Sequence, residues 1–160
     1  MSKFSITSPD FEEGGEIPKK FGYKHGNETP RIELHIPLSL PLESVALIMD
    51  DPDAMAAVGK VWVHWLIRST MMDPRLASVF DGKINIPTEK QLGFDKGKND
   101  FGEIGYGGPA PPDGRHTYIF KAYALDTMPE LKEGYSKQKL EHAMEGHILA
   151  EAKLTGTFTP

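Results

Sequence analysis

Four side chains that can bind or position a small polar ligand stand at the ends of strand-like segments. Asp51 stands two positions after Met49, the last residue of an apolar stretch, and His64 lies in a run rich in Val and Trp. His116 and Tyr118 are two residues apart in a third such run, so they share one strand face at a separation of about 7 Å. An imidazole and a phenol at that spacing can both donate to one oxyanion, and the imidazole can be charged near neutral pH. These residue types predict a small polar pocket.

Each of these residues also has a purely structural interpretation. Asp51 and Asp53 flank Pro52, and Asp and Pro are common turn formers, although a carboxylate here could instead line a pocket and orient an imidazole. His64 shares a strand face with Trp62. It is either a core histidine with a satisfied N–H or a ligand-binding group beside an aromatic wall. The sequence alone leaves both interpretations open.

A glycine-rich segment, Gly-Tyr-Gly-Gly-Pro-Ala-Pro-Pro at 105–112, is a second candidate for contact with a ligand. Glycines let the backbone approach a ligand closely, and successive N–H groups in a turn can hold an anion. Gly108 is the candidate donor, and Pro109 is expected to support the loop. The segment has no Gly-Lys-Ser/Thr ending, so it is not a P-loop.

Other chemistries are constrained by what the chain contains. There is no Gly-x-Ser-x-Gly motif, which removes the nucleophile elbow of the α/β-hydrolases. There are no cysteines, so disulfides, thiolate catalysis and sulfur-based zinc sites are excluded. His64, His116 and Asp51 have the residue types of a facial metal triad, and the sequence does not reject that arrangement. No metal or cofactor is predicted.

The bulk properties are those of one soluble domain. A chain of 160 residues with 39 % hydrophobic and 26 % charged residues is long enough to bury a core, so a single domain over 1–160 is expected. The formal charge of −5 argues against nonspecific nucleic-acid binding. No apolar segment has the length of a signal peptide or a membrane span. We therefore expect a cytoplasmic protein.

Hydrophobic periodicity predicts a mainly β architecture with one helix near the C-terminus. Strands are predicted at 31–36, 44–49, 61–67, 116–125 and 154–159, and the continuously apolar run at 44–49 favours a buried strand. The helix is predicted to begin at an N-cap, Ser136, and to follow apolar spacing as far as Glu151. A further helical turn is predicted at 129–134, and 87–115 is predicted to be a long loop rich in Gly and Pro.

Two histidines belong to the predicted helix. We expect His142 to face solvent and His147 to make a buried hydrogen bond.

The order of these motifs resembles that of the phosphatidylethanolamine-binding protein family, also called Raf kinase inhibitor-like proteins, and most closely its short bacterial and archaeal branch. The resemblance spans nearly the whole chain, and the motifs are jointly specific. They are Asp51-Pro52-Asp53-Ala54, Trp62-Val63-His64-Trp65, Asn99-Asp100-Phe101-Gly102, 105–112, His116-Thr117-Tyr118-Ile119-Phe120 and Glu145-Gly146-His147-Ile148-Leu149-Ala150.

The resemblance implies two antiparallel sheets with a small pocket for phosphate-like or carboxylate anions, including lipid headgroups. The pocket would comprise Asp51, Trp62, His64, Gly108, His116 and Tyr118, with Asp53 supporting a loop rather than touching the ligand. Non-catalytic anion binding is then the expected function. A kinase or protease inhibitor acting through protein contacts is the alternative, a metal-dependent hydrolase is a distant one, and a homodimer is left open.

Two departures from the family pattern stand near the predicted pocket. Met55 occupies a position where the family usually has proline, so one wall or the rim of the pocket is expected to differ. Thr117 replaces a usual arginine, but it should point to the opposite strand face from His116. We expect the charge needed by an anion to come from protonated His64 or His116, with Asp51 raising the imidazole pKa.

Overall fold

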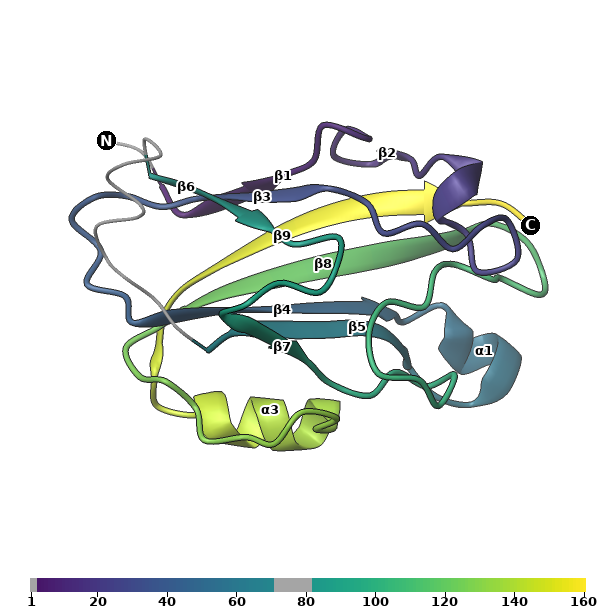
Figure 1. The fold of residues 1–160 in the computed structure, drawn as a ribbon. Coiled ribbons are helices and arrows are strands. Elements are labelled where there is room, and N and C mark those ends of the chain that lie inside the picture. Colours follow the sequence, from purple (N-terminus) through teal and green to yellow (C-terminus); the bar gives the residue numbers. More distant parts are fainter. Residues whose placement is uncertain (1–2, 71–81) are drawn as a thin grey trace.

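A computed structural model describes residues 3–70 and 82–160. A six-stranded sheet, in the order β2-β9-β8-β4-β5-β7, packs against a three-stranded sheet, in the order β1-β3-β6 (Figure 1). In this described part, neighbouring strands are antiparallel except for β2 and β9, which are parallel. The predicted class, mainly β with two sheets, is confirmed, with that one parallel pair as a departure.

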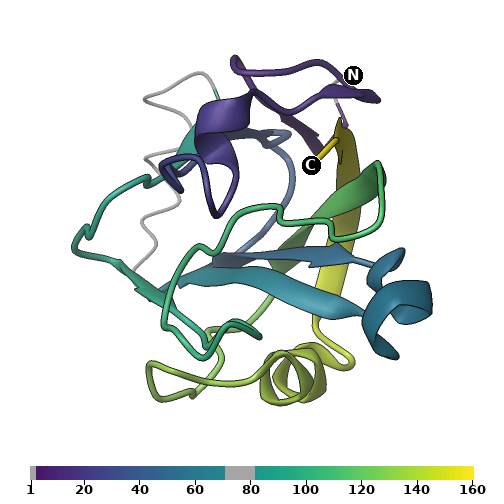
Figure 2. The same cartoon turned by 90° about the vertical axis from the view of Figure 1, so that its right-hand side faces the viewer.

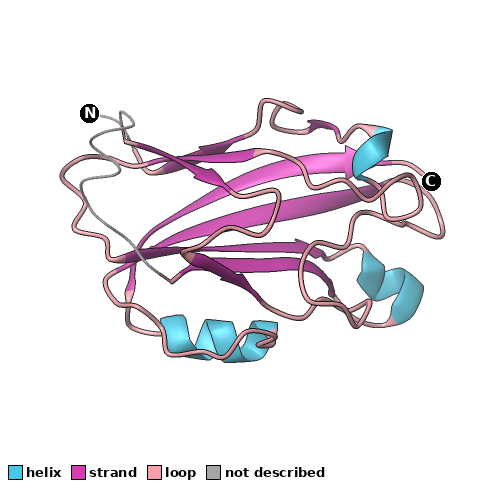
Figure 3. Cartoon of the chain, in the orientation of Figure 1, coloured by secondary structure: helices cyan, strands magenta, loops and turns pink. Residues whose placement is uncertain are grey.

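Short helices lie outside the sheets (Figure 3). In the described ranges, no helix is long and apolar enough to cross a membrane. In chain order the elements are β1 (Ser5–Thr7), β2 (Gly15–Glu16), a 3-10 helix (Lys19–Phe21), β3 (Ile32–His35), β4 (Ser44–Asp51), α1 (Ala54–Val58), β5 (Trp62–Ser69), β6 (Lys83–Ile86), β7 (Phe94–Lys96), β8 (His116–Leu125), α3 (Lys137–Met144) and β9 (Ile148–Phe158).

Strand β4 is buried at every position because both of its faces are covered. Val45 and Leu47 belong to a large core between the two sheets. Ala46 and Ile48 belong to a second core, which includes Leu140 of α3. A strand covered on both faces needs apolar residues at successive positions rather than alternating ones. This explains the continuous apolar run and confirms the predicted buried strand.

The strand predicted at 116–125 is confirmed as β8, whereas the end of the predicted helix is wrong. The Ser136 side chain accepts the backbone N–H of Lys139 at 3.1 Å, which confirms the N-cap. The helix, however, ends at Met144, because Gly146 has a φ of +77° and reverses the chain. Strand β9 therefore begins at Ile148, six residues before the start of the strand predicted at 154–159.

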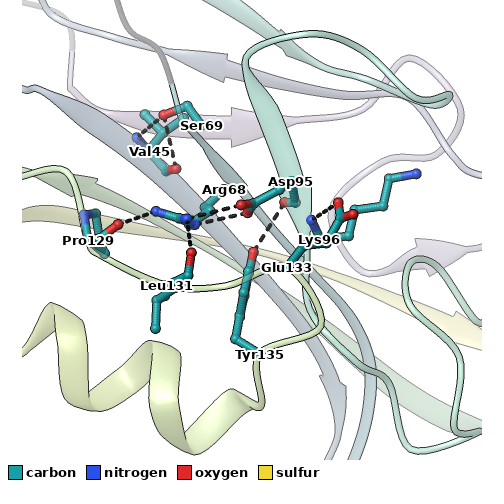
Figure 4. A network of polar contacts seen from close by, with 9 residues as sticks. All are labelled: Val45, Arg68, Ser69, Asp95, Lys96, Pro129, Leu131, Glu133 and Tyr135. Carbon is teal, nitrogen blue, oxygen red and sulfur yellow. Dashed lines mark hydrogen bonds and ion pairs between the residues drawn. The ribbon is translucent and has the colours of Figure 1, made fainter.

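The prediction of a helical turn at 129–134 is also wrong, because carbonyl groups of this segment accept hydrogen bonds from a buried arginine. Arg68 of β5 binds Asp95 with two hydrogen bonds of 2.9 and 3.0 Å. Its guanidinium also donates to the carbonyls of Pro129 and Leu131 (Figure 4). The segment is thus held against the sheet by side-chain hydrogen bonds in place of helical ones.

The two histidines predicted on the helix have different outcomes. His142 faces solvent as predicted, with a side chain that is 83 % exposed. His147 lies after the helix, is about half exposed, and bonds Asp126 at 2.8 Å. The prediction of a buried hydrogen bond is therefore wrong, because the chain turns before reaching it.

The long segment 87–115 is more ordered than its composition suggests. It includes β7, which pairs with β5, and a loop closed by the side chain of Asn99. This side chain donates to the Gly105 carbonyl at 3.0 Å and accepts the N–H groups of Phe101 and Glu103. Asn99 is 3 % exposed, so one buried amide supplies the hydrogen bonds that a loop rich in glycine cannot supply itself.

Candidate functional site

A cavity of about 230 Å³ lies at one end of the six-stranded sheet, beside residues of α1. Figure 2 shows α1 at that end of the sheet. Strand β4 ends at Asp51, beside the beginning of β5 with Trp62 and His64 and the beginning of β8 with His116 and Tyr118. Antiparallel neighbours place the end of one strand beside the starts of the others, which brings these distant residues together. The cavity is lined by Asp51, Ala54, Ala57, Val58, Trp62, His64, Phe101, Ala110, Pro112, His116 and Tyr118.

His116 lies between two carboxylates. Its Nδ1 is 2.6 Å from an oxygen of Asp51, and its Nε2 is 2.6 Å from an oxygen of Asp113. Burial disfavours a charged imidazole, but the hydrogen bonds to Asp51 and Asp113 outweigh it and raise the pKa of His116. Because carboxylate oxygens only accept, these two contacts favour the imidazolium form, with a proton on each ring nitrogen. The sequence singled out His116 and Asp51 but missed Asp113, which has the residue type of an ordinary turn.

Asp51 is buried with its partner. Burial raises the pKa of its carboxyl group, although His116 and the N–H of Asp53 act in the opposite direction. That N–H lies 2.9 Å from Asp51 Oδ1, so Asp51 makes the local turn and also orients the imidazole. The structural and functional interpretations of this residue are both compatible with its contacts.

His64 is neutral, which corrects the expectation that it could supply positive charge. It is 3 % exposed, and burial lowers its pKa to about 4, despite hydrogen bonds to the backbone. Its Nδ1 lies 2.7 Å from the Gly107 carbonyl. Because a carbonyl only accepts, Nδ1 carries the proton and Nε2 keeps its lone pair. His64 therefore offers the cavity a hydrogen-bond acceptor.

Tyr118 and Trp62 both line the cavity, and among the described residues neither the Tyr118 hydroxyl nor Trp62 Nε1 has a hydrogen-bond partner of ordinary geometry. The Tyr118 ring lies beside His64 and His116. The Tyr118 side chain is fully buried. Burial, followed by the charge of Asp51, raises its pKa above the ordinary value, so the hydroxyl keeps its proton. The ring packs edge-on against His64 at 5.1 Å. A buried hydroxyl without a partner costs about 1–3 kcal/mol, and a ligand oxygen could remove that cost.

An aromatic wall closes one side of the cavity. Phe101 packs at 5.5 Å from Trp62 and at 5.6 Å from His64, in both cases edge-on. On its other side it stacks on Tyr23 at 3.9 Å. Trp62 was expected to be a wall, whereas Phe101 was missed as a lining residue. The only indication of Phe101 in the sequence was its place in the motif Asn99-Asp100-Phe101-Gly102, whose loop positions the ring.

Helix α1 forms the rim and was not predicted. Ala54, Ala57 and Val58 line the cavity, whereas Met55 is outside the lining and 53 % exposed. The Met55 N–H donates to the Pro52 carbonyl at 3.2 Å, a bond that proline could not make. The departure at Met55 therefore changes the turn leading into the rim, and the side chain itself is not part of a cavity wall.

Gly108 does not present its N–H to the cavity, which corrects its predicted role. That N–H donates to the side-chain oxygen of Asn27 at 2.7 Å. A Cβ at this position would lie 2.0 Å from the carbonyl oxygen of Phe21, so glycine is required by close backbone packing. The neighbouring carbonyl of Pro109, predicted to support this loop, accepts the N–H of Tyr23 at 2.9 Å.

Asp53 and Thr117 are tied to each other. The carboxylate of Asp53 accepts the backbone N–H of Thr117 at 2.8 Å, and neither residue lines the cavity. Asp53 thus links the turn after β4 to the start of β8.

The metal triad considered from the sequence is not assembled. In residues 3–70 and 82–160, no group of three or more His, Cys, Asp or Glu side chains is placed to hold a metal ion. His116 uses both nitrogens in hydrogen bonds to carboxylates, and His64 uses Nδ1 for a carbonyl. The arrangement is suited to holding a small ligand by hydrogen bonds rather than by a metal ion.

Comparison with known proteins gives one consistent result. The family described as phosphatidylethanolamine-binding protein matches residues 7–159. UPF0098 proteins from Chlamydia muridarum and Methanothermobacter thermautotrophicus are 39 % and 42 % identical to the chain, covering 96 % and 92 % of it and 97 % and 93 % of their own lengths.

Two solved structures share the fold. CT736 of Chlamydia trachomatis, described as a phosphatidylethanolamine-binding protein homolog, is 34 % identical with a TM-score of 0.82, covering 98 % of this chain and 97 % of its own. YbcL of E. coli, described as a member of the mammalian PEBP family, is 26 % identical with a TM-score of 0.79, covering 98 % of each chain. The chain therefore belongs to the phosphatidylethanolamine-binding protein family, in its short bacterial and archaeal branch.

Proposed function

We propose that the protein binds a small ligand with an anionic group in the cavity lined by His116 and Tyr118, and that it does so without catalysis. The observation that carries this proposal is the contact between His116 Nε2 and the carboxylate of Asp113. A charged, buried imidazole already holds a carboxylate from a half-exposed side chain. A ligand carboxylate or phosphate is an acceptor of the same kind.

The other cavity groups support the same ligand class. Tyr118 offers a hydroxyl donor that no group in residues 3–70 and 82–160 uses. His64 Nε2 can accept from a protonated ligand oxygen or another polar group of the ligand. At about 30 Å³ per water, the cavity has room for roughly seven water molecules, so the ligand or its bound portion is small.

The non-catalytic part of the proposal rests on what surrounds the imidazole. The cavity lining described above includes no Ser, Thr, Cys or Lys that His116 could activate as a nucleophile. Both of its nitrogens lie 2.6 Å from carboxylates, which favour the protonated ring, so His116 is poorly suited to accept a proton. Location in the cytoplasm and a single domain over 1–160 remain predictions.

Titration with sodium acetate and sodium phosphate, followed by NMR of the imidazole side chains, tests the proposal. We expect the signals of His116 to move saturably and those of His147 to stay in place. His116→Gln should abolish the response of the remaining cavity residues. His147→Gln is the matched control, since His147 also pairs with an aspartate but lies outside the cavity lining. Unchanged anion affinity in His116→Gln would refute the proposal.

A second candidate, inhibition of a kinase or protease through surface contacts, is favoured by exposed apolar side chains on the 87–115 segment. Leu92 is 87 % exposed and Ile104 is 56 % exposed. Leu92→Ser and Ile104→Ser should weaken inhibition of a sensitive kinase or protease, while Leu38→Ser, at a site 73 % exposed elsewhere, should not. Equal inhibition by all three variants would exclude this surface.

A further inference from the structure

Asp113 occupies the hydrogen bond that an anionic ligand needs. Its carboxylate lies 2.6 Å from Nε2 of His116, whose other N–H is held by buried Asp51. An imidazolium has one proton on each nitrogen. A ligand that accepts the hydrogen bond from Nε2 must therefore displace Asp113. Displacement of Asp51 instead would leave a carboxylate that is only 4 % exposed without its partner.

The two carboxylates differ in how easily they can leave. The side chain of Asp113 is 53 % exposed, whereas that of His116 is 5 % exposed. Asp113 lies in the loop before β8, next to Gly114, which has a φ of +138° and no neighbour near a Cβ position. Water can hydrate the Asp113 carboxylate as soon as it releases the imidazole, so its release costs little desolvation.

The local charge decides which ligands can replace it. Asp51 and Asp113 contribute two negative charges, and His116 contributes one positive charge. Asp51, Asp53 and Asp113 all raise the pKa of the Tyr118 hydroxyl through their charges, so the cavity is in a negative field. Lys60, on the loop before β5, is paired with Asp100 at 3.0 Å. When Asp113 turns out into solvent, a singly charged group in its place keeps the charge in direct contact with His116 constant, whereas a dianion adds one negative charge there.

Apart from Asp51, His64, His116 and Tyr118, the side chains that line the cavity are mainly apolar. Its walls include Val58, Trp62, Phe101 and Pro112. We propose, building on the proposed anion site, that Asp113 is an internal competitor, and that the cavity selects monoanions joined to a small apolar group over dianions and over neutral analogues. The ligand's anionic group takes the place of the Asp113 carboxylate on His116, and its apolar part packs on the aromatic wall.

Binding of benzoate, measured by calorimetry on the full chain at pH 7, tests the competition. Asp113→Asn and Asp113→Ala should bind benzoate roughly three- to tenfold more tightly than the unmodified protein, the size expected for loss of a charged hydrogen bond at a half-exposed site. Asp126→Asn is the matched control, because it removes an exposed carboxylate from another histidine, His147. The Asp126→Asn variant should bind benzoate with the same affinity as the unmodified protein.

Selectivity is tested in the unmodified protein with three phenyl ligands. Benzoate should bind more tightly than phenyl phosphate, which is mainly a dianion at pH 7 because its second pKa is about 6, and more tightly than neutral benzamide. Acetate, which lacks the ring, should bind more weakly than benzoate. Saturation with benzoate should also shift the carboxyl ¹³C signal of Asp113, a readout that does not depend on a variant folding normally.

The outcomes separate this inference from the function on which it rests. Equal benzoate affinity in the unmodified protein and both Asp113 variants, with no shift of the Asp113 carboxyl signal, overturns the competition and leaves the anion site standing. Tighter binding of phenyl phosphate than benzoate overturns the monoanion preference. Failure of acetate, phosphate and benzoate to bind to any of the variants overturns the proposed function together with the inference.

Discussion

Replacement of His64 by Asn should remove an acid-sensitive contribution to the free energy of unfolding. His64 is 3 % exposed, and burial lowers its pKa from 6.5 to about 4 in the folded chain. In the unfolded chain the imidazole regains its ordinary pKa near 6.5. A group whose folded-state pKa is depressed contributes stability that is fully present above the unfolded-state pKa. That contribution is lost as pH falls toward the folded-state pKa.

The magnitude follows from those two pKa values. At about 1.36 kcal/mol per pH unit, the difference between 6.5 and about 4 corresponds to a loss of about 3 kcal/mol between pH 7 and pH 4. Asn does not titrate, and its side-chain nitrogen occupies nearly the position of Nδ1. It can therefore still donate to the Gly107 carbonyl that His64 now binds at 2.7 Å.

Urea denaturation at several pH values between 4 and 7, followed by tryptophan fluorescence and circular dichroism, measures the effect. We expect the unmodified protein to be more stable than His64→Asn at pH 7 and to lose about 3 kcal/mol of that difference by pH 4. The remaining titratable groups are common to both proteins and cancel in the comparison. Parallel stability curves, or a ¹⁵N spectrum showing charged His64 at pH 6, would refute the reasoning.

Three further predictions concern other parts of the site and the fold. Asp51→Asn should lower the pKa of His116 measured by NMR. Because the His116 pKa is raised in the folded state, its stabilising contribution is complete below about pH 6.5 and is lost as pH rises through the folded-state value, a loss that should be smaller in this variant. Gly108→Ala should lower the unfolding free energy by at least roughly 1–3 kcal/mol in urea titrations, since the added Cβ would meet the Phe21 carbonyl at 2.0 Å; an unaltered midpoint would contradict the packing. Arg68→Met should cost about 3–5 kcal/mol by the same measurement, because it leaves Asp95 without its buried partner, and wild-type stability would show that the network in Figure 4 contributes nothing net.

The candidate site was predictable where residue type and strand position were enough. Asp51, His64, His116 and Tyr118 lie at strand ends in the sequence, and antiparallel pairing brings strand ends to one edge of a sheet. Protonation states were not predictable in the same way. His64 and His116 have the same side chain, but buried His64 faces a backbone carbonyl, whereas His116 faces two carboxylates. Their pKa values therefore shift in opposite directions.

The misplaced elements have a common physical cause. Periodicity continued the helix beyond Met144 because His147, Ile148 and Glu151 keep its spacing, but a left-handed glycine ended it. No helical turn forms at 129–134, because carbonyl groups there accept hydrogen bonds from Arg68, a residue some sixty positions away in the chain. Local patterns report what a segment prefers by itself, and long-range hydrogen bonds can outweigh that preference.

By itself, the sequence determined the family, the mainly β class and the set of chemical groups at one end of the sheet, because these depend on residue type, order and apolar spacing. Only the tertiary structure decided which of those groups remain available to a ligand. It assigned the Gly108 N–H to Asn27, made His64 neutral and placed Asp113 on His116. Burial and the identity of the nearest hydrogen-bond partner set those states, and both arise only when distant segments pack together.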